Sequence, residues 1–453
     1  MKSKLKTLFN NSIIFFVSDI LTKGISFILV PIYTFNLSKE EYGLVDLYEV
    51  FIMLGVPIIS LMIFESLLRY VYEYQNKRMI LNNSIILVLL SGCLTFWIAL
   101  LLKFIYKDYP FLELFTIIFL QSIFYCYLHY YRGINKLLYF MTGSILLAIC
   151  NLLLQLIMIM KLNMGISGYL NANIISLFIS IAFLILVDYR SLKYLISDLN
   201  LVLIKELMNF GIPLIPNKIM WWAINSASKI IVLIFLGVTA NGVLAVSSKI
   251  PGLINLFSSV FLKAWQLTLY EDNQNEKIFN LILKAYILFF TILISFLTVF
   301  DETIFSLFIS KRFSDAFDYI PYFLISAMFL SLSGYVGSIF MKEKKTRFIL
   351  YSSIIAAIIN IFTNLLLINI LGLYSVTVAA IVSYVFLFLL RIKEAKKIMS
   401  IDLNIYYYLL MISLMLIEIL NNAPAVFYYL NLCFLIMLFI FNCIKLIKGR
   451  LNS

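Results

Sequence analysis

Apolar stretches of about 20 residues recur along the whole chain between short polar segments, and a helix of that length spans a hydrocarbon core of about 30 Å. The pattern predicts about fourteen such helices. Their centres lie near residues 23, 57, 91, 119, 149, 177, 222, 252, 289, 330, 357, 382, 412 and 434. We therefore expect an all-α polytopic membrane protein with both termini on the same side of the bilayer.

The composition also favours a membrane protein. Of the 453 residues, 63% are hydrophobic and 13% are charged, whereas a soluble chain is about half apolar and about a quarter charged. The formal net charge of +12 indicates loops that face anionic lipid. No basic run is interleaved with aromatic residues, so we expect membrane lipids, and not nucleic acid, as partners.

The distribution of lysine and arginine predicts the orientation, because cytoplasmic loops of membrane proteins carry an excess of these residues. With a cytoplasmic N-terminus, 25 of the 35 basic residues lie at cytoplasmic ends and loops, and six lie on the opposite side. The remaining four lie inside predicted helices: Lys23, Lys218, Lys229 and Lys249. The uneven split supports the helix count and places both termini in the cytoplasm.

No loop is long enough to form a domain of its own. We predict an N-terminal lobe of helices one to six over residues 1–190, a cytoplasmic connector over 191–204 and a C-terminal lobe of helices seven to twelve over 205–399. Residues 400–453 are expected to form helices thirteen and fourteen and a cytoplasmic tail.

A weak internal repeat supports the two lobes. The segment LSKEEYG, Leu37–Gly43, follows helix one as LGVTANG, Leu236–Gly242, follows helix seven. Likewise MGISG, Met164–Gly168, precedes helix six as LGLYS, Leu371–Ser375, precedes helix twelve. Because six crossings return the chain to the same side, the lobes would be oriented alike, as in parallel-repeat transporters.

Charged residues inside membrane helices indicate function, because burying a charge at the bilayer centre costs roughly 2.5–3.5 kcal/mol on insertion scales. Helical spacing places Lys218, Trp222, Asn225 and Lys229 on one face of helix seven. Polar residues on helices one, two and eight would line the same cavity: Asp19, Lys23, Asp46, Glu49 and Lys249. In the alternative interpretation these lysines snorkel to the interface, and Asp46 and Glu49 are ordinary helix N-terminal charges.

Several prolines fall inside or near predicted helices, where the ring removes a backbone hydrogen bond and permits a bend. Pro31, Pro213, Pro216 and Pro251 are therefore candidate hinges, although proline is frequent in membrane helices for structural reasons alone.

Two further polar features are interpreted as structural. His129 is the only histidine in the chain, and a single histidine cannot form a metal site or a catalytic triad. Glu65 and Arg69, four residues apart at the inner end of helix two, are expected to form an ion pair.

A cavity with several lysines and a tryptophan face suits an anionic ligand with sugar rings. Ammonium groups pair with phosphate as point charges, and aromatic faces pack against the C–H surfaces of sugars. A pyrophosphate-linked glycan has both features. We expect no metal, no cofactor and no covalent chemistry at this site.

The motifs resemble those of a known family. The stretch Phe210–Gln266 resembles the second-lobe opening of Wzx-type polysaccharide flippases of the MATE-like MOP superfamily, and Pro31-Ile-Tyr33, Leu37–Gly43 and Arg69 look like that family's first two helices. The resemblance implies two six-helix lobes around a V-shaped cavity that opens alternately to either side, here with two extra C-terminal helices. Many relatives have an acid where this chain has Ser228, and a tyrosine where it has Leu244.

The resemblance implies a flippase of the bacterial plasma (inner) membrane and no enzymatic activity. Its substrate would be undecaprenyl-pyrophosphate carrying an oligosaccharide repeat unit, moved to the outer leaflet for O-antigen, capsule or related polysaccharide assembly, with a polymerase and chain-length proteins as further partners. Energy could come from the membrane potential, or from H⁺ or Na⁺ exchange at Asp19, Asp46 or Glu49.

Three alternatives stay open at this point. A lipid II flippase fits fourteen helices. A MATE-like drug or cation exporter would favour an acidic cavity, whereas the deep charges here are mostly basic. A membrane glycan polymerase would carry a large outer loop, and none is predicted.

Overall fold

The computed structural model describes residues 21–22, 24–187, 199–271, 276–299, 306–343 and 345–401. Within these ranges the regular structure is helical, with no strand. The all-α polytopic fold class is therefore confirmed. Asp19, Lys23 and predicted helices thirteen and fourteen lie outside the described residues.

Nine helices in the described ranges are long and apolar enough to cross a membrane, and the pair Leu201–Ala223 and Ser226–Leu236 passes the same test as one broken span. A shorter apolar helix, Gly24–Asn36, corresponds to predicted helix one. The chain is thus a multi-pass membrane protein, and the predicted total of fourteen crossings is compatible with the helices described.

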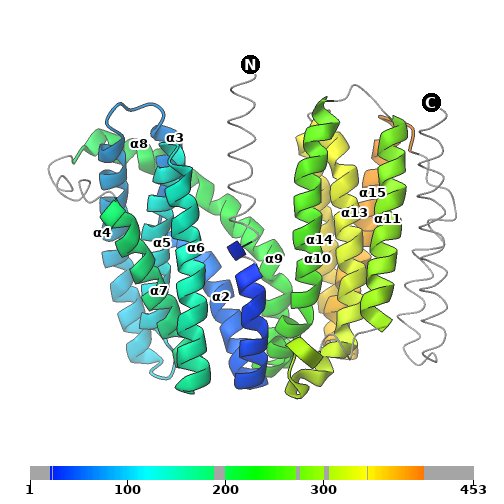
Figure 1. Ribbon diagram of the computed structural model, residues 1–453, viewed down its shortest axis with the longest axis horizontal. Coiled ribbons are helices and arrows are strands. Elements are labelled where there is room, and N and C mark those ends of the chain that lie inside the picture. Colours follow the sequence, from blue (N-terminus) through cyan, green and yellow to red (C-terminus); the bar gives the residue numbers. More distant parts are fainter. Residues whose placement is uncertain are drawn as a thin grey trace. The chain divides into compact units, whose positions relative to one another are not determined.

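The chain divides into two compact units, Met1–Ala227 and Ser228–Ser453. After helix Gly24–Asn36, the first unit contains the following helices and turns: α2 (Lys39–Ile59), α3 (Ile63–Tyr70), α4 (Lys77–Ile105), α5 (Phe111–Gly133), α6 (Leu137–Gln155), the π-helical turn η1 (Leu156–Lys161), α7 (Gly165–Val187), α8 (Leu201–Gly211), the 3₁₀ turn η3 (Ile212–Leu214) and the start of α9 (Ile215–Leu236). Figure 1 shows α4 to α7 running along one another, and α5 packs against α4, α6 and α7.

Predicted helix two is split into α2 and α3. It begins with a capping box, in which Ser38 Oγ accepts from the Glu41 backbone N–H at 3.1 Å and the Glu41 carboxylate accepts from the Ser38 N–H at 2.9 Å. It breaks where Leu61 and Met62 adopt left-handed conformations, with φ of 50° and 54°. Such backbone is strained for branched or bulky residues and persists only where the surroundings hold it.

Helix α8 packs across α3 and α4 and stabilises the break between α2 and α3. Ser66 Oγ donates to the Leu207 carbonyl at 2.8 Å, and Tyr74 Oη donates to the Glu206 carboxylate at 2.6 Å. The second bond raises the pKa of the Tyr74 phenol, because the carboxylate stabilises the protonated hydroxyl. Through these contacts α8 belongs to the first unit. The predicted connector, 191–204, lies mostly outside the described residues, so the predicted lobe boundary stays a prediction.

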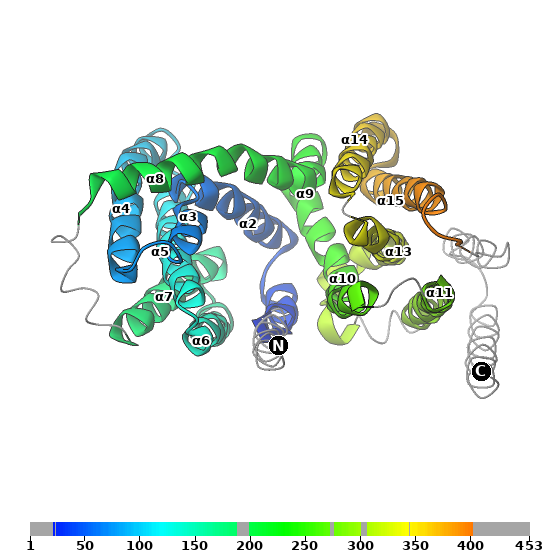
Figure 2. The ribbon, with the colours of Figure 1, turned by 90° about the horizontal axis from the view of Figure 1, so that it is seen from above.

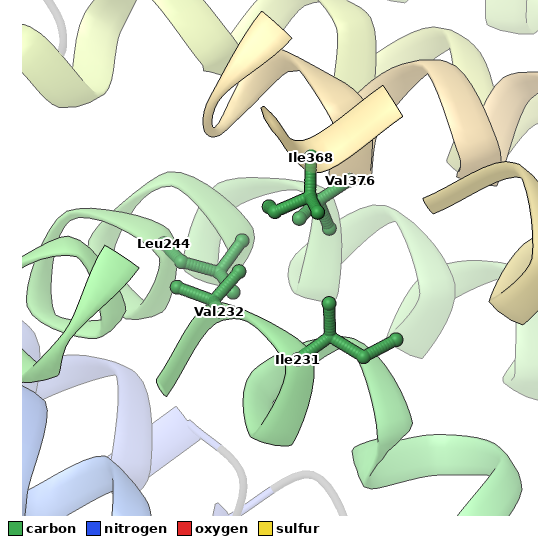
Figure 3. Close-up of a cluster of buried hydrophobic side chains, with 5 residues drawn as sticks. All are labelled: Ile231, Val232, Leu244, Ile368 and Val376. Atoms are coloured by element: carbon green, nitrogen blue, oxygen red, sulfur yellow. The ribbon is translucent and has the colours of Figure 1, made fainter. Parts of the chain in front are cut away.

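The second unit contains the rest of α9, then α10 (Val238–Glu271), α11 (Glu276–Val299), the 3₁₀ segment η4 (Lys311–Tyr319), α13 (Ile320–Lys342), α14 (Thr346–Leu371) and α15 (Tyr374–Ala395). Helix α13 is the centre of this unit, because it packs against α10, α11 and α15 (Figure 2). A buried cluster joins α9, α10, α14 and α15 (Figure 3): Ile231, Val232, Leu244, Ile368 and Val376.

One of the two sequence repeats has a glycine with nearly the same positive φ in both units. Gly165 begins α7 at φ +54°, and Gly372, which precedes α15, has φ +55°. Side chains other than hydrogen disfavour this left-handed region. The match supports a shared origin of the two turns.

Arg391 is the most buried described charge of the second unit, at 6% exposure. Its guanidinium donates to the Ser333 carbonyl at 2.9 Å, to Ser352 Oγ at 3.2 Å and to Ser353 Oγ at 3.0 Å. These bonds connect α13, α14 and α15, and the planar fork of arginine suits three partners in different directions.

Replacing Arg391 with lysine should destabilise the second unit, because lysine keeps the charge but cannot reach all three partners. We expect a loss of about 2 kcal/mol, measured as a lower midpoint of thermal unfolding in detergent. The control is Lys393→Gln, an exposed position on the same helix, which should leave the midpoint unchanged. Equal midpoints for the two variants would contradict the role of Arg391.

Candidate functional site

The first unit contains a cavity of about 490 Å³ between helix Gly24–Asn36, α2, α5, α6 and α7. Its polar lining comes from Thr22, Ser26, Tyr33, Glu49, Gln121, Tyr125, Ser144, Asn151, Gln155, Tyr169 and Asn173. A polar hollow inside a membrane bundle provides hydrogen-bonding groups that lipid cannot satisfy, and such positions mark ion or substrate pathways.

An amide network forms one wall of this cavity. Asn151 Nδ2 donates to Asn173 Oδ1 at 2.8 Å and to Ser176 Oγ at 3.2 Å, and Gln155 Nε2 donates to Asn151 Oδ1. Asn173 Nδ2 in turn donates to the Tyr169 carbonyl at 2.9 Å. The network therefore joins α6 to α7 and fixes the direction of the amides that face the cavity.

The two acids of α2 have different surroundings. Asp46 is buried, at 3% exposure, whereas Glu49 is half-buried and lines the cavity. Glu49 also lies close enough to Tyr33 and Tyr169 to interact with both electrostatically. Of these two predicted coupling residues, Glu49 is the one that an ion in the cavity could reach.

A second cavity, of about 450 Å³, lies between α2, α3, α5 and α9. It brings together Lys218, Trp221 and Trp222 from α9 with Glu65 from α3 and His129 from α5. Gln121 and Tyr125 line both cavities, and Gln121 Nε2 donates to Tyr125 Oη at 3.0 Å. This bonded pair therefore contributes to the wall of each cavity.

Trp222 is held in place by its polar atom. Its Nε1–H donates to the Val50 carbonyl of α2 at 2.8 Å, which satisfies the only donor of the indole. The ring is thereby fixed against α2 while it lines the second cavity. A ring immobilised in advance binds a flat apolar surface at a smaller entropic cost.

In the second unit Lys229, on α9, and Lys249, on α10, are both half-buried. Ser228, where many relatives are expected to carry an acid, donates to Asn360 Oδ1 at 3.2 Å, and Asn360 Nδ2 donates to Ser383 Oγ at 3.3 Å. Ser228 therefore belongs to a series of uncharged, hydrogen-bonded side chains that connects α9, α14 and α15.

The structure brings together some of the predicted site residues. Lys218 and Trp222 share a cavity, while Glu49 lines the neighbouring one. The backbone of Asn225 lies in α9, and its side chain is outside what the structure describes. A single cavity that also contains Lys229 and Lys249 stays a prediction, as do the roles of Asp19 and Lys23, which lie outside the described residues.

The candidate hinge prolines lie in four different settings. Pro31 is half-buried in helix Gly24–Asn36, and Pro251 is buried within α10. Pro213 lies in the 3₁₀ turn η3 between α8 and α9, and Pro216 lies in the first turn of α9, both of them exposed. Only Pro213 therefore coincides with an interruption of α-helix, and the hinge function stays a prediction.

Arg69 forms a different ion pair from the one predicted. The predicted Glu65–Arg69 ion pair is wrong: Arg69 Nη2 pairs instead with Glu73 Oε1 at 2.7 Å, since Glu73 lies four residues further along, in the exposed turn after α3. Glu65 lines the second cavity.

The sequence-based prediction did not include the cavity-lining amides Gln121, Asn151, Gln155 and Asn173. The four-residue spacing of Asn151 and Gln155 inside an apolar helix could have identified them.

The sequence of residues 8–269 matches the model of a family described as polysaccharide biosynthesis protein. That region is more than half of the chain. The chain belongs to the polysaccharide biosynthesis protein family. The resemblance to Wzx-type flippases of the MOP superfamily is thereby confirmed at family level. No curated protein matches the chain.

Solved structures share the fold of this family member. Lipid II flippase MurJ, in an inward closed conformation, is similar with a TM-score of 0.69 and 14% identity, over 98% of this chain and 100% of that one. An inward-facing multidrug resistance MATE transporter of the MOP superfamily is similar with a TM-score of 0.60 and 14% identity, over 83% of this chain and 94% of that one. At these identities the likeness establishes the fold.

Asn173→Leu should loosen the contact between α6 and α7, because it removes the acceptor for Asn151 and leaves that amide less satisfied. The expected cost is about 1 kcal/mol, measured as a lower midpoint of thermal unfolding in detergent. Asn171→Leu, the same change on the same helix and outside the network, is the control. A larger loss in the control than in Asn173→Leu would contradict a stabilising network.

Proposed function

We propose that the protein moves an undecaprenyl-pyrophosphate-linked oligosaccharide repeat unit from the cytoplasmic to the outer leaflet of the bacterial inner membrane. Movement would proceed by alternating access, for O-antigen, capsule or a related polysaccharide. The observation that carries the proposal is the cavity in which Lys218 lies beside Trp221 and Trp222, in a chain that belongs to a polysaccharide biosynthesis family.

The chemistry of that cavity suits the ligand. Lysine offers three donors and a positive charge to phosphate oxygens, and the tryptophan faces offer apolar surface to an isoprenoid or a sugar ring. Lys23, Lys229 and Lys249 belong to the proposal because they lie inside predicted helices. In this proposal both termini are cytoplasmic, no chemical bond is broken, and a polymerase and chain-length proteins take over the product.

A lipid II-type flippase is the second candidate. The observation that favours it is the fold similarity to lipid II flippase MurJ along nearly the whole of both chains. Lipid II is also a pyrophosphate-linked lipid, so the same cavity chemistry applies. The two candidates differ in the glycan, and parallel assays with each lipid separate them.

Flipping can be measured in proteoliposomes that contain labelled lipid-linked repeat unit, as the fraction of glycan that becomes accessible to a membrane-impermeant reagent. The wild-type protein should raise this rate above that of protein-free vesicles. An unchanged rate with the repeat unit and an increased rate with lipid II would replace the first candidate with the second. No increase with either lipid would overturn both.

Lys218→Ala should lower the flipping rate about tenfold, because a lost charge-assisted contact is worth about 1.5 kcal/mol or more. Lys311→Ala, which removes an exposed lysine of η4, should flip at the wild-type rate. If Lys218→Ala inserts in normal amounts and flips like wild type, the cationic cavity does not bind the substrate.

For energy coupling we propose proton exchange at Glu49, since this acid lines the first cavity while Asp46 is buried. One proton per cycle across a gradient of one pH unit can raise the accumulation ratio at most about tenfold. Glu49→Gln should lose this dependence on the gradient and retain slow equilibration.

The control for Glu49→Gln is Glu40→Gln, at an exposed position in the first turn of α2. It should respond to the gradient like wild type. A Glu49→Gln protein that still responds fully to the proton gradient would exclude this coupling site. A response to Na⁺ or to membrane potential alone would also exclude it.

A further inference from the structure

The second cavity contains a histidine, His129, that has no part in the proposed function. His129, on α5, lines it together with Glu65 of α3 and Lys218 of α9. In the sequence these three residues lie far apart, and His129 was interpreted as structural. Their convergence on one hollow of about 450 Å³ puts an imidazole, which can gain a proton and a positive charge, beside the ammonium group of Lys218.

The orientation of the imidazole identifies the nitrogen that can titrate. His129 Nδ1 lies 2.9 Å from the Tyr125 carbonyl oxygen. Since a carbonyl oxygen only accepts, Nδ1 carries a hydrogen in both charge states. Nε2, on the opposite side of the ring, is then the atom that gains or loses a proton and remains for a ligand. The ring itself is flanked by Phe64, with centroids 5.0 Å apart.

The charges around His129 come from three helices. They are Glu65 on α3, Lys218 on α9 and Arg132 on α5 itself. The residues with which α2 lines the cavity are apolar, namely Ile52, Met53, Val56 and Pro57, and α6 and α7 contribute none. Glu65 is therefore the acid among the residues that line the second cavity with His129 and Lys218.

We propose that His129, protonated at Nε2, acts with Lys218 to bind the phosphate groups of an anionic lipid-linked ligand, and that Glu65 competes with those phosphates for the same two cations. The inference rests on the proposed function for the class of ligand. It adds a second cation that is present only when His129 is protonated. Trp221 and Trp222 complete the site with apolar faces.

Protonation of His129 makes ligand binding tighter at acid pH, whereas the ionisation of the ligand alone would make it tighter at alkaline pH. Acid pH favours the imidazolium form of a histidine, so it adds a positive charge to the cavity and tightens binding. A pyrophosphate monoester becomes more negative as pH rises, which by itself would tighten binding at alkaline pH. The two effects have opposite signs, and a variant without the histidine separates them.

The test is equilibrium binding of radiolabelled undecaprenyl pyrophosphate to the full-length protein in lipid nanodiscs at pH 5.5 and pH 8. For the wild type, Kd should be about tenfold lower at the acid pH, because a hydrogen bond to a charged partner is gained. His129→Gln, neutral at both values, should lose this difference or reverse it. Lys218→Gln should weaken binding at both values and keep the ratio, and Glu65→Gln should tighten it at both.

Two results would overturn the inference. One is a wild-type Kd that does not fall at acid pH, and the other is an acid-dependent fall of the same size in His129→Gln. If His129→Gln does not fold, as judged by thermal unfolding, His129→Asn takes its place. Absence of binding by every protein at both pH values would overturn the inference as well. The flipping assay with the complete repeat unit tests the proposed function separately, so the two can fail independently.

Discussion

A polar group inside a bilayer must find its partner within the protein, because hydrocarbon offers neither donors nor acceptors. This constraint makes the described chain helical and determines where its polar side chains can lie. The amides of Asn151 and Asn173 bond to each other across α6 and α7, and Ser228 and Asn360 do so across α9 and α14. Arg391 satisfies three acceptors at once.

Much of the fold was predictable because span length and loop charge act locally. Each of the nine described helices that are long enough to cross a membrane contains a predicted centre, and Gly165 and Gly372 of the turn repeat have nearly the same positive φ. The break between α2 and α3 was not predictable. Pro57 marks the region, but the left-handed residues are Leu61 and Met62, which have no local preference for that conformation and are held by contacts with a helix far along the chain.

The candidate site was predictable in part for the same reason. Helical spacing along one segment placed Lys218 and Trp222 on one face, and the structure puts both in one cavity. The same reasoning treated Glu65 and Arg69 as a pair and His129 as isolated. Only the packing of α3, α5 and α9 brings Glu65 and His129 to Lys218, and no spacing along a single helix contains that information.

Gly211 closes the turn before η3, and a Cβ there would lie 2.5 Å from the Leu61 carbonyl oxygen. The last residue of α8 thus packs directly against the strained backbone between α2 and α3. Helix α9, which carries Lys218, begins after the three residues of η3. The break at Leu61 and Met62 is therefore connected to Lys218 through α8 and η3. A shift of α8 by even one bond length would have to be accommodated at Leu61, and from there by the helix that carries Glu65.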